Sequence, residues 1–187
     1  KNGDGKVMAA QSKVGTQRLV NWNNTYTGPK VGGKLNGLDV FTFTHDDHDG
    51  FRTENETCQR TVFLVDRPRK HYKIMGLYGD YGDRGVRADN ADDTYHFNHG
   101  GYVAGMYNTG LASSWQVSYE LNKPQIVAMT QCADNYTATD AKKIFYSHYQ
   151  AYIGLYCPHD SRGFDGDMAE MIAFNRVLSD EEILEVQ

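Results

Sequence analysis

Apolar residues recur along this chain in short runs separated by turn residues, a spacing typical of β-strands rather than of long helices. In Trp115–Leu121, apolar residues take the odd positions and polar residues the even ones, which predicts a strand with one face in the core. Thr61–Val65 is more continuously apolar and favours a strand between two layers. The expected strands are Val40–Phe43, Thr61–Asp66, Lys73–Tyr78, Trp115–Leu121, Gln125–Thr130, Ile144–Tyr146, Ala151–Tyr156 and Met168–Phe174.

One short helix is predicted at the end of the chain, over residues 179–186. Ser179 is a suitable N-cap, and Glu182 follows three residues later, as a capping box requires. Asp180 and Glu181 add negative charge to the first turn, where the helix dipole favours it. Many short strands and one terminal helix indicate an all-β fold, a two-sheet antiparallel sandwich of the jelly-roll kind.

Length and composition limit the class of protein. At 187 residues, we expect a single domain spanning residues 1–187. The net charge of -5 and the pI near 5.8 disfavour a nucleic-acid partner, which requires a basic face. No apolar run reaches the roughly 18 residues of a membrane span, so we expect no membrane insertion. The chain begins at Lys1 without a visible signal peptide, which suggests a domain excised from a larger multidomain protein or a processed product.

Candidate metal ligands lie in three acidic clusters, His45–Gly50, Gly79–Asp93 and His159–Asp167. Closely spaced carboxylates on glycine-containing loops suit Ca²⁺, which binds six to eight oxygens. The expected calcium ligands are Asp80, Asp83, Asp89, Asp92 and Asp93 in the second cluster, with Asp46, Asp49 and Asp165 in the other two. Two other interpretations stay open. Asp and Gly are common in ordinary surface turns, and the histidines that flank Asp46 and Asp47 would suit a transition metal.

Tyrosine, histidine, arginine and glycine are concentrated in the middle of the chain, between Tyr78 and Tyr107. Ligand pockets combine an apolar wall with a few placed polar groups, and Tyr-rich loops on a rigid sandwich bind sugars or peptides. The predicted ligand-binding residues are Tyr81, Arg84, Arg87, Tyr95, His96 and Tyr102. The alternative is that many of these tyrosines pack on the sheets, and we expect Trp22 and Trp115 to be packing residues.

The segment Phe164–Ile183 carries a family resemblance. It has Ala-Glu before a run of apolar residues, then Asn175-Arg176, then Leu-Ser-Asp-Glu-Glu. This resembles the closing motif of concanavalin A-like lectin/glucanase domains of the laminin-G-like type, with Met168 and Phe174 where that family usually has Ile and Tyr. Looser matches are Trp22–Asn24, Gly32–Phe43, Thr61–Val65 and Ala151–Leu155. The resemblance implies the sandwich fold and an extracellular or cell-surface location. It also implies a structural role for Glu170, the one Glu on a predicted buried element, at the strand-to-helix turn.

Catalytic motifs are not apparent in the sequence. The glucanase branch of the resembled family uses a Glu-x-Asp-x-x-Glu strand, because two carboxylates must flank the scissile bond, and this chain has no such pattern. A polysaccharide lyase using His96 with Tyr95 or Tyr102 is a less favoured alternative.

We therefore predict a non-catalytic, lectin-like adhesion module that recognises surface glycans with the help of Ca²⁺. One alternative is calcium-dependent binding of short peptide C-termini, as in ligand-binding domains of large bacterial adhesins that the chain resembles, with Arg84 or Arg87 holding the terminal carboxylate. Another is a structural spacer.

Overall fold

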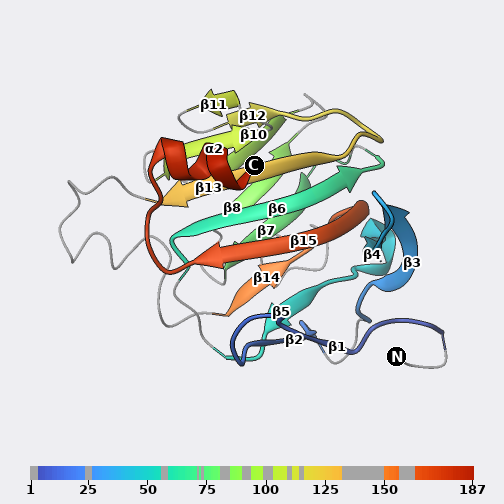
Figure 1. Cartoon of the computed structure of the whole chain (residues 1–187). Helices are drawn as coiled ribbons and strands as arrows, with labels where there is room; N and C mark the ends of the chain where they lie inside the picture. The colour runs from blue at the N-terminus through green and yellow to red at the C-terminus, as the bar shows by residue number, and fades with distance from the viewer. Residues whose placement is uncertain are drawn as a thin grey trace.

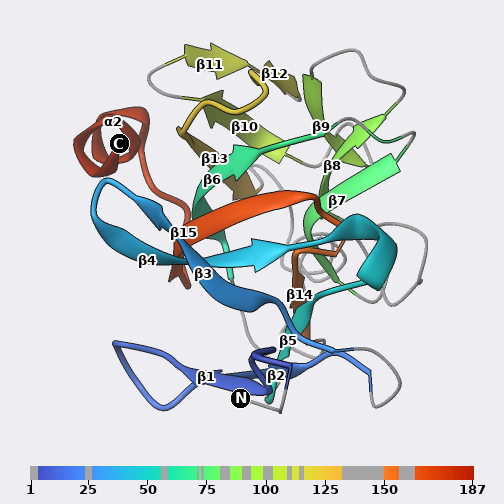
Figure 2. The ribbon, with the colours of Figure 1, turned by 90° about the vertical axis from the view of Figure 1, so that its right-hand side faces the viewer.

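The fold comes from a computed structural model, which describes residues 4–23, 27–55, 59–70, 72, 74–80, 85–89, 94–98, 103–108, 111–113, 116–131, 150–155 and 163–187. For some strand residues in these ranges, among them 80, 87, 89 and 96, the description covers the backbone alone. The strands of the described residues form two antiparallel sheets that lie face to face (Figures 1 and 2). The predicted all-β, two-sheet sandwich is confirmed, whereas its jelly-roll character stays a prediction.

One sheet has the strand order β11-β10-β13-β6-β15-β4-β3, and the other has the order β1-β2-β5-β14-β7-β8-β9-β12. In chain order, the elements are β1 (Ala9–Gln11), β2 (Arg18–Asn21), β3 (Lys30–Leu35), β4 (Leu38–Phe43), the 3-10 helix η1 (His45–Asp47), β5 (Phe51–Thr53), β6 (Thr61–Pro68), β7 (Ile74–Asp80), β8 (Gly85–Asp89), β9 (Thr94–Asn98), β10 (Val103–Asn108), β11 (Leu111–Ser113), β12 (Gln116–Ser118), β13 (Gln125–Gln131), β14 (Ala151–Ile153), β15 (Gly166–Phe174) and α2 (Asp180–Val186).

The main hydrophobic core lies between the sheets. Strand β6 shows how the sequence produces it: Val62 and Leu64 join the main core, while Phe63 belongs to a second apolar cluster. Successive residues of a strand point to opposite faces, so β6 is covered on both sides. The continuous apolar run that predicted a strand between two layers is therefore explained by burial of both faces.

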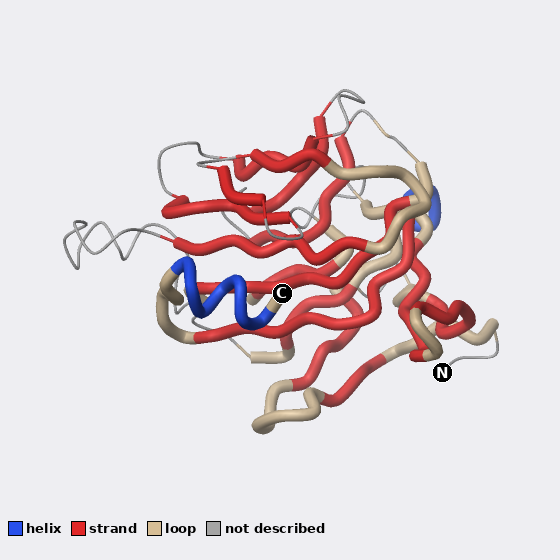
Figure 3. The backbone as a smooth tube through the Cα atoms, turned by 45° about the horizontal axis from the view of Figure 1, so that its top comes forward, coloured by secondary structure: helices blue, strands red, loops and turns tan. Residues whose placement is uncertain are grey.

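Helix α2 covers the outer face of the first sheet, where Ile183 and Leu178 pack with Phe63 and Ala128 (Figure 3). The predicted capping box is confirmed, since the Ser179 hydroxyl accepts from the Glu182 N–H and the Glu182 carboxylate accepts from the Ser179 N–H. The same carboxylate takes two hydrogen bonds from Arg176, at 2.7 and 2.8 Å, which lower the pKa of Glu182 to about 2. Glu182 and not Glu170 therefore holds the strand-to-helix turn. Glu170 is exposed and lies 3.8 Å from Lys13, which corrects the expected role.

The predicted strands fall on β4, β6, β7, β12, β13, β14 and β15, while Ile144–Tyr146 lies outside the described residues. The predicted alternation holds where side chains are described, because Val117 and Tyr119 are buried and Ser118 and Glu120 are exposed. Sequence patterns did not reveal β1, β2, β3, β5, β8, β9, β10 and β11.

A polar bridge joins the two sheets inside the core. Asp66 on β6 is fully buried, and its Oδ2 accepts from the Tyr95 hydroxyl on β9 at 2.8 Å and from Gln125 Nε2 at 3.1 Å. Burial raises the pKa of the Asp66 carboxyl to about 7, although the hydrogen bonds from Tyr95 and Gln125 oppose that rise. Asp66 forms no ion pair with any described residue, and the donors to its carboxylate among them, Tyr95 and Gln125, are neutral.

Candidate ligand-binding surface

The first acidic cluster forms a loop that leads from β4 through η1 into β5. His48 follows η1 in the left-handed conformation, with φ 52°, which turns the chain back toward the sheet. The Thr44 N–H donates to the Asp49 carboxylate at 3.2 Å and so closes the loop. Asp46 is directed outward with 76% of its side chain exposed, whereas Asp49 is fully buried.

Lys6 supplies the positive charge that this loop requires. Its ammonium lies 2.6 Å from Asp49 Oδ1 and 3.0 Å from Asp47 Oδ2, and 7% of its side chain is exposed. Burial lowers the pKa of Lys6, but the hydrogen bonds to Asp49 and Asp47 outweigh that effect and leave the pKa raised. A calcium ion at Asp49 would have to displace this ammonium, so Asp49 does not fit the predicted role of a calcium ligand.

The carboxylates of the third cluster that the structure describes are also paired with cations of the chain. Asp165 Oδ1 lies 3.3 Å from Arg69 Nε, and its Oδ2 is 3.5 Å from the Tyr72 hydroxyl. Asp167 accepts from Arg67 at 2.6 Å and from Thr42 at 2.7 Å. Asp165 is therefore neutralised by an arginine, and its predicted role as a calcium ligand does not fit this arrangement.

Most of the predicted site lies outside the described side chains. Tyr81, Asp83, Arg84, Asp92, Asp93 and Tyr102 are outside the described residues, and Asp80, Arg87, Asp89 and His96 are described by their backbone alone. Strand register nevertheless places Arg87 of β8 opposite His96 of β9, and Asp80 of β7 opposite Ala151 of β14. Among the described residues no group of three His, Cys, Asp or Glu could hold a metal ion.

Tyr95 is the one predicted ligand-binding residue with a described side chain, and it belongs to the core. Its ring is fully buried and stacks on Tyr119 at a centroid distance of 4.4 Å. Its hydroxyl donates to Asp66, and burial raises the pKa of Tyr95 well above its usual value. We therefore correct its assignment, because a residue in the sheet-to-sheet bridge is not available to a ligand.

Sequence reasoning missed a different group of residues, on the outer face of the second sheet. Arg52 of β5 lies opposite Val20 of β2 on one side and opposite Tyr152 of β14 on the other. Its chain neighbours Phe51 and Thr53 are buried, and Phe51 is part of the core, so Arg52 is directed away from the core. Tyr152 packs with Trp22 in a separate apolar cluster. We call Val20, Trp22, Arg52 and Tyr152 the arginine patch.

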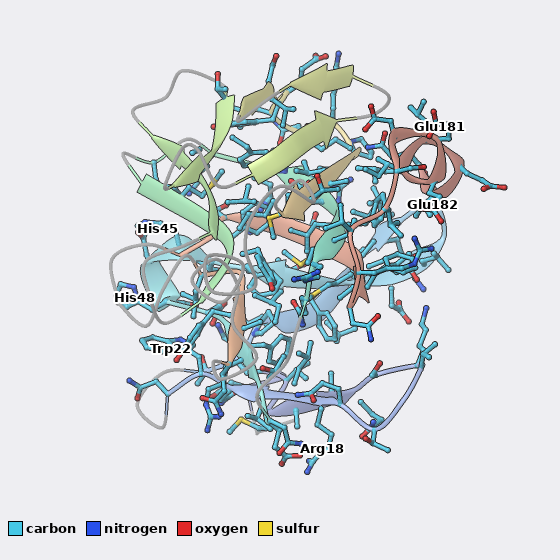
Figure 4. The ribbon with its side chains drawn as sticks, turned by 90° about the vertical axis from the view of Figure 1, so that its left-hand side faces the viewer. Arg18, Trp22, His45, His48, Glu181 and Glu182 are labelled. Carbon is cyan, nitrogen blue, oxygen red and sulfur yellow. The ribbon has the colours of Figure 1, made fainter. Side chains whose placement is uncertain are left out.

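The acidic loop and the arginine patch are adjoining parts of one surface. Trp22 Nε1–H donates to the His48 carbonyl oxygen at 2.9 Å. Gly50 lies so close to Leu155 and Trp22 that a Cβ at this position would be 2.3 Å from the Leu155 side chain. Figure 4 shows Trp22 and His48 on the same side of the molecule, opposite Glu181 and Glu182 of α2. The expectation that Trp22 is a packing residue is confirmed, because 8% of it is exposed.

Above the acidic loop, the His45 ring stacks on Tyr72 at a centroid distance of 3.7 Å and an interplanar angle of 7°. His45 Nδ1 lies 3.2 Å from Asp46. The surface thus combines outward-directed carboxylates, a stacked aromatic pair and a half-buried guanidinium, all held by packing and hydrogen bonds. Such an arrangement can donate to and accept from a polyhydroxylated ligand.

Comparison with family models and with curated proteins gave no match to this chain. The resemblance to concanavalin A-like, laminin-G-like domains therefore stays a prediction from the closing motif. Neither helix of the described residues is long and apolar enough to cross a membrane.

Proposed function

We propose that this chain is a non-catalytic, extracellular ligand-binding module that recognises glycans on a cell surface. The observation that carries the proposal is the surface formed by the acidic loop and the arginine patch. Sugar hydroxyls both donate and accept hydrogen bonds, so they need carboxylate acceptors such as Asp46 and Asp47 beside a donor such as Arg52. These three side chains come from a loop and a strand fixed to a rigid sandwich, which is where binding residues concentrate.

Calcium assistance is part of this proposal, with its ligands in the segment Asp80–Asp93. That segment carries the predicted ligands Asp80, Asp83, Asp89, Asp92 and Asp93. Strand β8 pairs with β7 so that Gly85 lies opposite Gly79 and Asp89 opposite Ile74, which puts Asp80 and Asp89 at opposite ends of this strand pair. The ion would therefore be bound at one end, by Asp80 with Asp83 or by Asp89 with Asp92 and Asp93. Bound Ca²⁺ would supply a hard cation for sugar hydroxyls and would fix the loop that carries its ligands.

Peptide binding is less favoured because of how the strands pair. An extended peptide usually adds to an open sheet edge through its backbone. Strand β5, which carries Arg52, is hydrogen-bonded to β2 on one side and to β14 on the other. It therefore offers no open edge, whereas a sugar ring can lie across paired strands.

The proposal is tested on one array that carries both glycans and peptides with free C-termini, screened with calcium and with chelator. We expect saturable binding to glycans, weakened by chelator and restored by added calcium. Asp46→Asn should weaken the binding about tenfold or more, the effect of one lost hydrogen bond to a charged acceptor. Glu181→Gln, which removes an exposed carboxylate on α2, is the control and should leave binding unchanged. Binding to peptides alone would contradict the proposal.

A further inference from the structure

Arg52 is the one lysine or arginine of the proposed surface that has no ion-pair partner among the described residues. Arg52 is half-buried, and its side chain forms no hydrogen bond or ion pair with any described residue. Partly burying a guanidinium is unfavourable unless a partner replaces the lost water. The other buried or half-buried cations of this surface have partners: Lys6 binds Asp47 and Asp49, and Arg69 binds Asp165.

The surroundings of Arg52 hold it in place without neutralising it. Trp22, Tyr152 and Leu155 form a buried apolar cluster beside it, so the sheet under the guanidinium is firmly packed. Arg18 lies on β2, two residues from Val20 and on the same face, so it is a diagonal neighbour of Arg52 at about 7–8 Å. Arg18 is paired with Glu54 at 3.0 Å. Among the described residues, Arg52 is therefore the unpaired cation in this part of the surface, although the chain as a whole carries -5.

The residues beside Arg52 in its cross-strand row carry no charge. Across the sheet the row runs from Ala9 through Val20, Arg52 and Tyr152 to Gly79. The row continues to Gly85 of β8 and Asn98 of β9, and Arg52 is the one charged residue in it. A planar guanidinium offers two parallel N–H donors, which match the two oxygens of a carboxylate.

We propose that Arg52 binds the carboxylate of an acidic sugar, so that the glycan recognised by this surface contains uronic acid or a similar carboxylated residue. This inference rests on the proposed function and specifies the ligand class of the same surface. A carboxylate would complete the guanidinium with a bidentate hydrogen bond, and the sugar ring would lie over β2 and β5, where Val20 and Arg52 are partly exposed. The paired strands on both sides of β5 favour this ligand over a peptide terminus, because they leave no open sheet edge for a peptide backbone.

The test compares three oligosaccharides of equal length by titration calorimetry, one neutral, one built from uronic acids and one sulfated. We expect the uronic acid oligosaccharide to bind at least tenfold more tightly than the other two. Arg52→Gln should abolish that preference, and its melting temperature should match that of the wild type, because Arg52 has no described partner to lose. Arg60→Gln, the same substitution at an exposed arginine beside β6, is the control and should keep the preference.

The outcomes separate this inference from the proposed function. Equal binding of neutral and acidic sugars, or a preference that survives Arg52→Gln, overturns the inference and leaves glycan recognition standing. Tighter binding of the sulfated sugar also overturns the inference, because Arg52 would then recognise negative charge in general and not a planar carboxylate. Binding of none of the three sugars overturns both. Arg52-dependent binding of a peptide with a free C-terminus would also overturn the inference, because the bound carboxylate would then belong to a peptide and not to a sugar.

Discussion

Replacing Asp66 by Asn should remove a pH dependence of stability that originates in the core. Asp66 is fully buried between the sheets, and its pKa is raised from 3.8 to about 7. The folded state therefore keeps its proton to a higher pH than the unfolded state does. Below about pH 4, Asp66 is protonated in both states and does not reduce the free energy of unfolding. As the pH rises from about 4 to 7 the free energy of unfolding falls, and above about pH 7 it stays at the lower value.

The magnitude follows from the size of the shift. A rise of roughly three pKa units at 1.36 kcal/mol each corresponds to about 4 kcal/mol. The asparagine variant cannot ionise, so the stability of the wild type relative to Asp66→Asn should fall by about 4 kcal/mol between pH 4 and pH 8. All other titrating groups are common to both proteins and largely cancel in this difference.

Urea unfolding at a series of pH values, followed by tryptophan fluorescence, measures this difference. Tyr95→Phe is the second variant: it removes a hydrogen bond that favours the ionised carboxylate, so the decline should extend to higher pH. The reasoning would be refuted if the free energy of unfolding of the wild type, relative to Asp66→Asn, stayed constant from pH 4 to pH 8 or rose with pH.

Two further substitutions test the packing that supports the surface. Lys6→Met leaves Asp49 buried without its cation and should lower the free energy of unfolding in urea by about 3–5 kcal/mol. Lys34→Met breaks an exposed pair with Asp39 and should lower it by less than about 1 kcal/mol. Equal losses would mean that the Lys6 pair is solvated. Gly154→Ala should lower the melting temperature, because Gly154 has φ +74° and a Cβ there would lie 2.3 Å from the Phe43 ring, and an unchanged melting temperature would contradict this geometry.

Features set by neighbouring residues were predictable from the sequence. The capping box needs Ser179 and Glu182 three residues apart, and both are visible in the chain. The β3–β4 hairpin was equally local: Asn36 and Gly37 have φ 49° and 83°, and Asn-Gly between strands is a strong hairpin signal. We nevertheless predicted only the strand after this turn, Val40–Phe43, and not the strand before it.

Features set by distant residues were not predictable. Strand β5 has three residues, too few for an alternating pattern, and it forms because β2 and β14 pair with it on both sides. Lys6 and Asp49 are 43 residues apart, so nothing local revealed that the acidic loop has its own cation. From the sequence, Tyr95 was interpreted as an exposed loop residue, because its partner Asp66 lies on the opposite sheet and far away in the chain. The sequence could not show that Arg52 lacks an ion-pair partner among the described residues, because its neighbours come from β2 and β14.

The central claim is that this module binds a glycan and leaves it intact. The most direct measurement is calorimetric titration with the strongest glycan of the array, with calcium and with chelator, followed by chromatography of the recovered glycan after prolonged incubation. We predict one saturable binding event that chelator weakens, with the glycan recovered unchanged. The absence of saturable heat with any glycan, or the recovery of shortened or unsaturated products, would contradict the account.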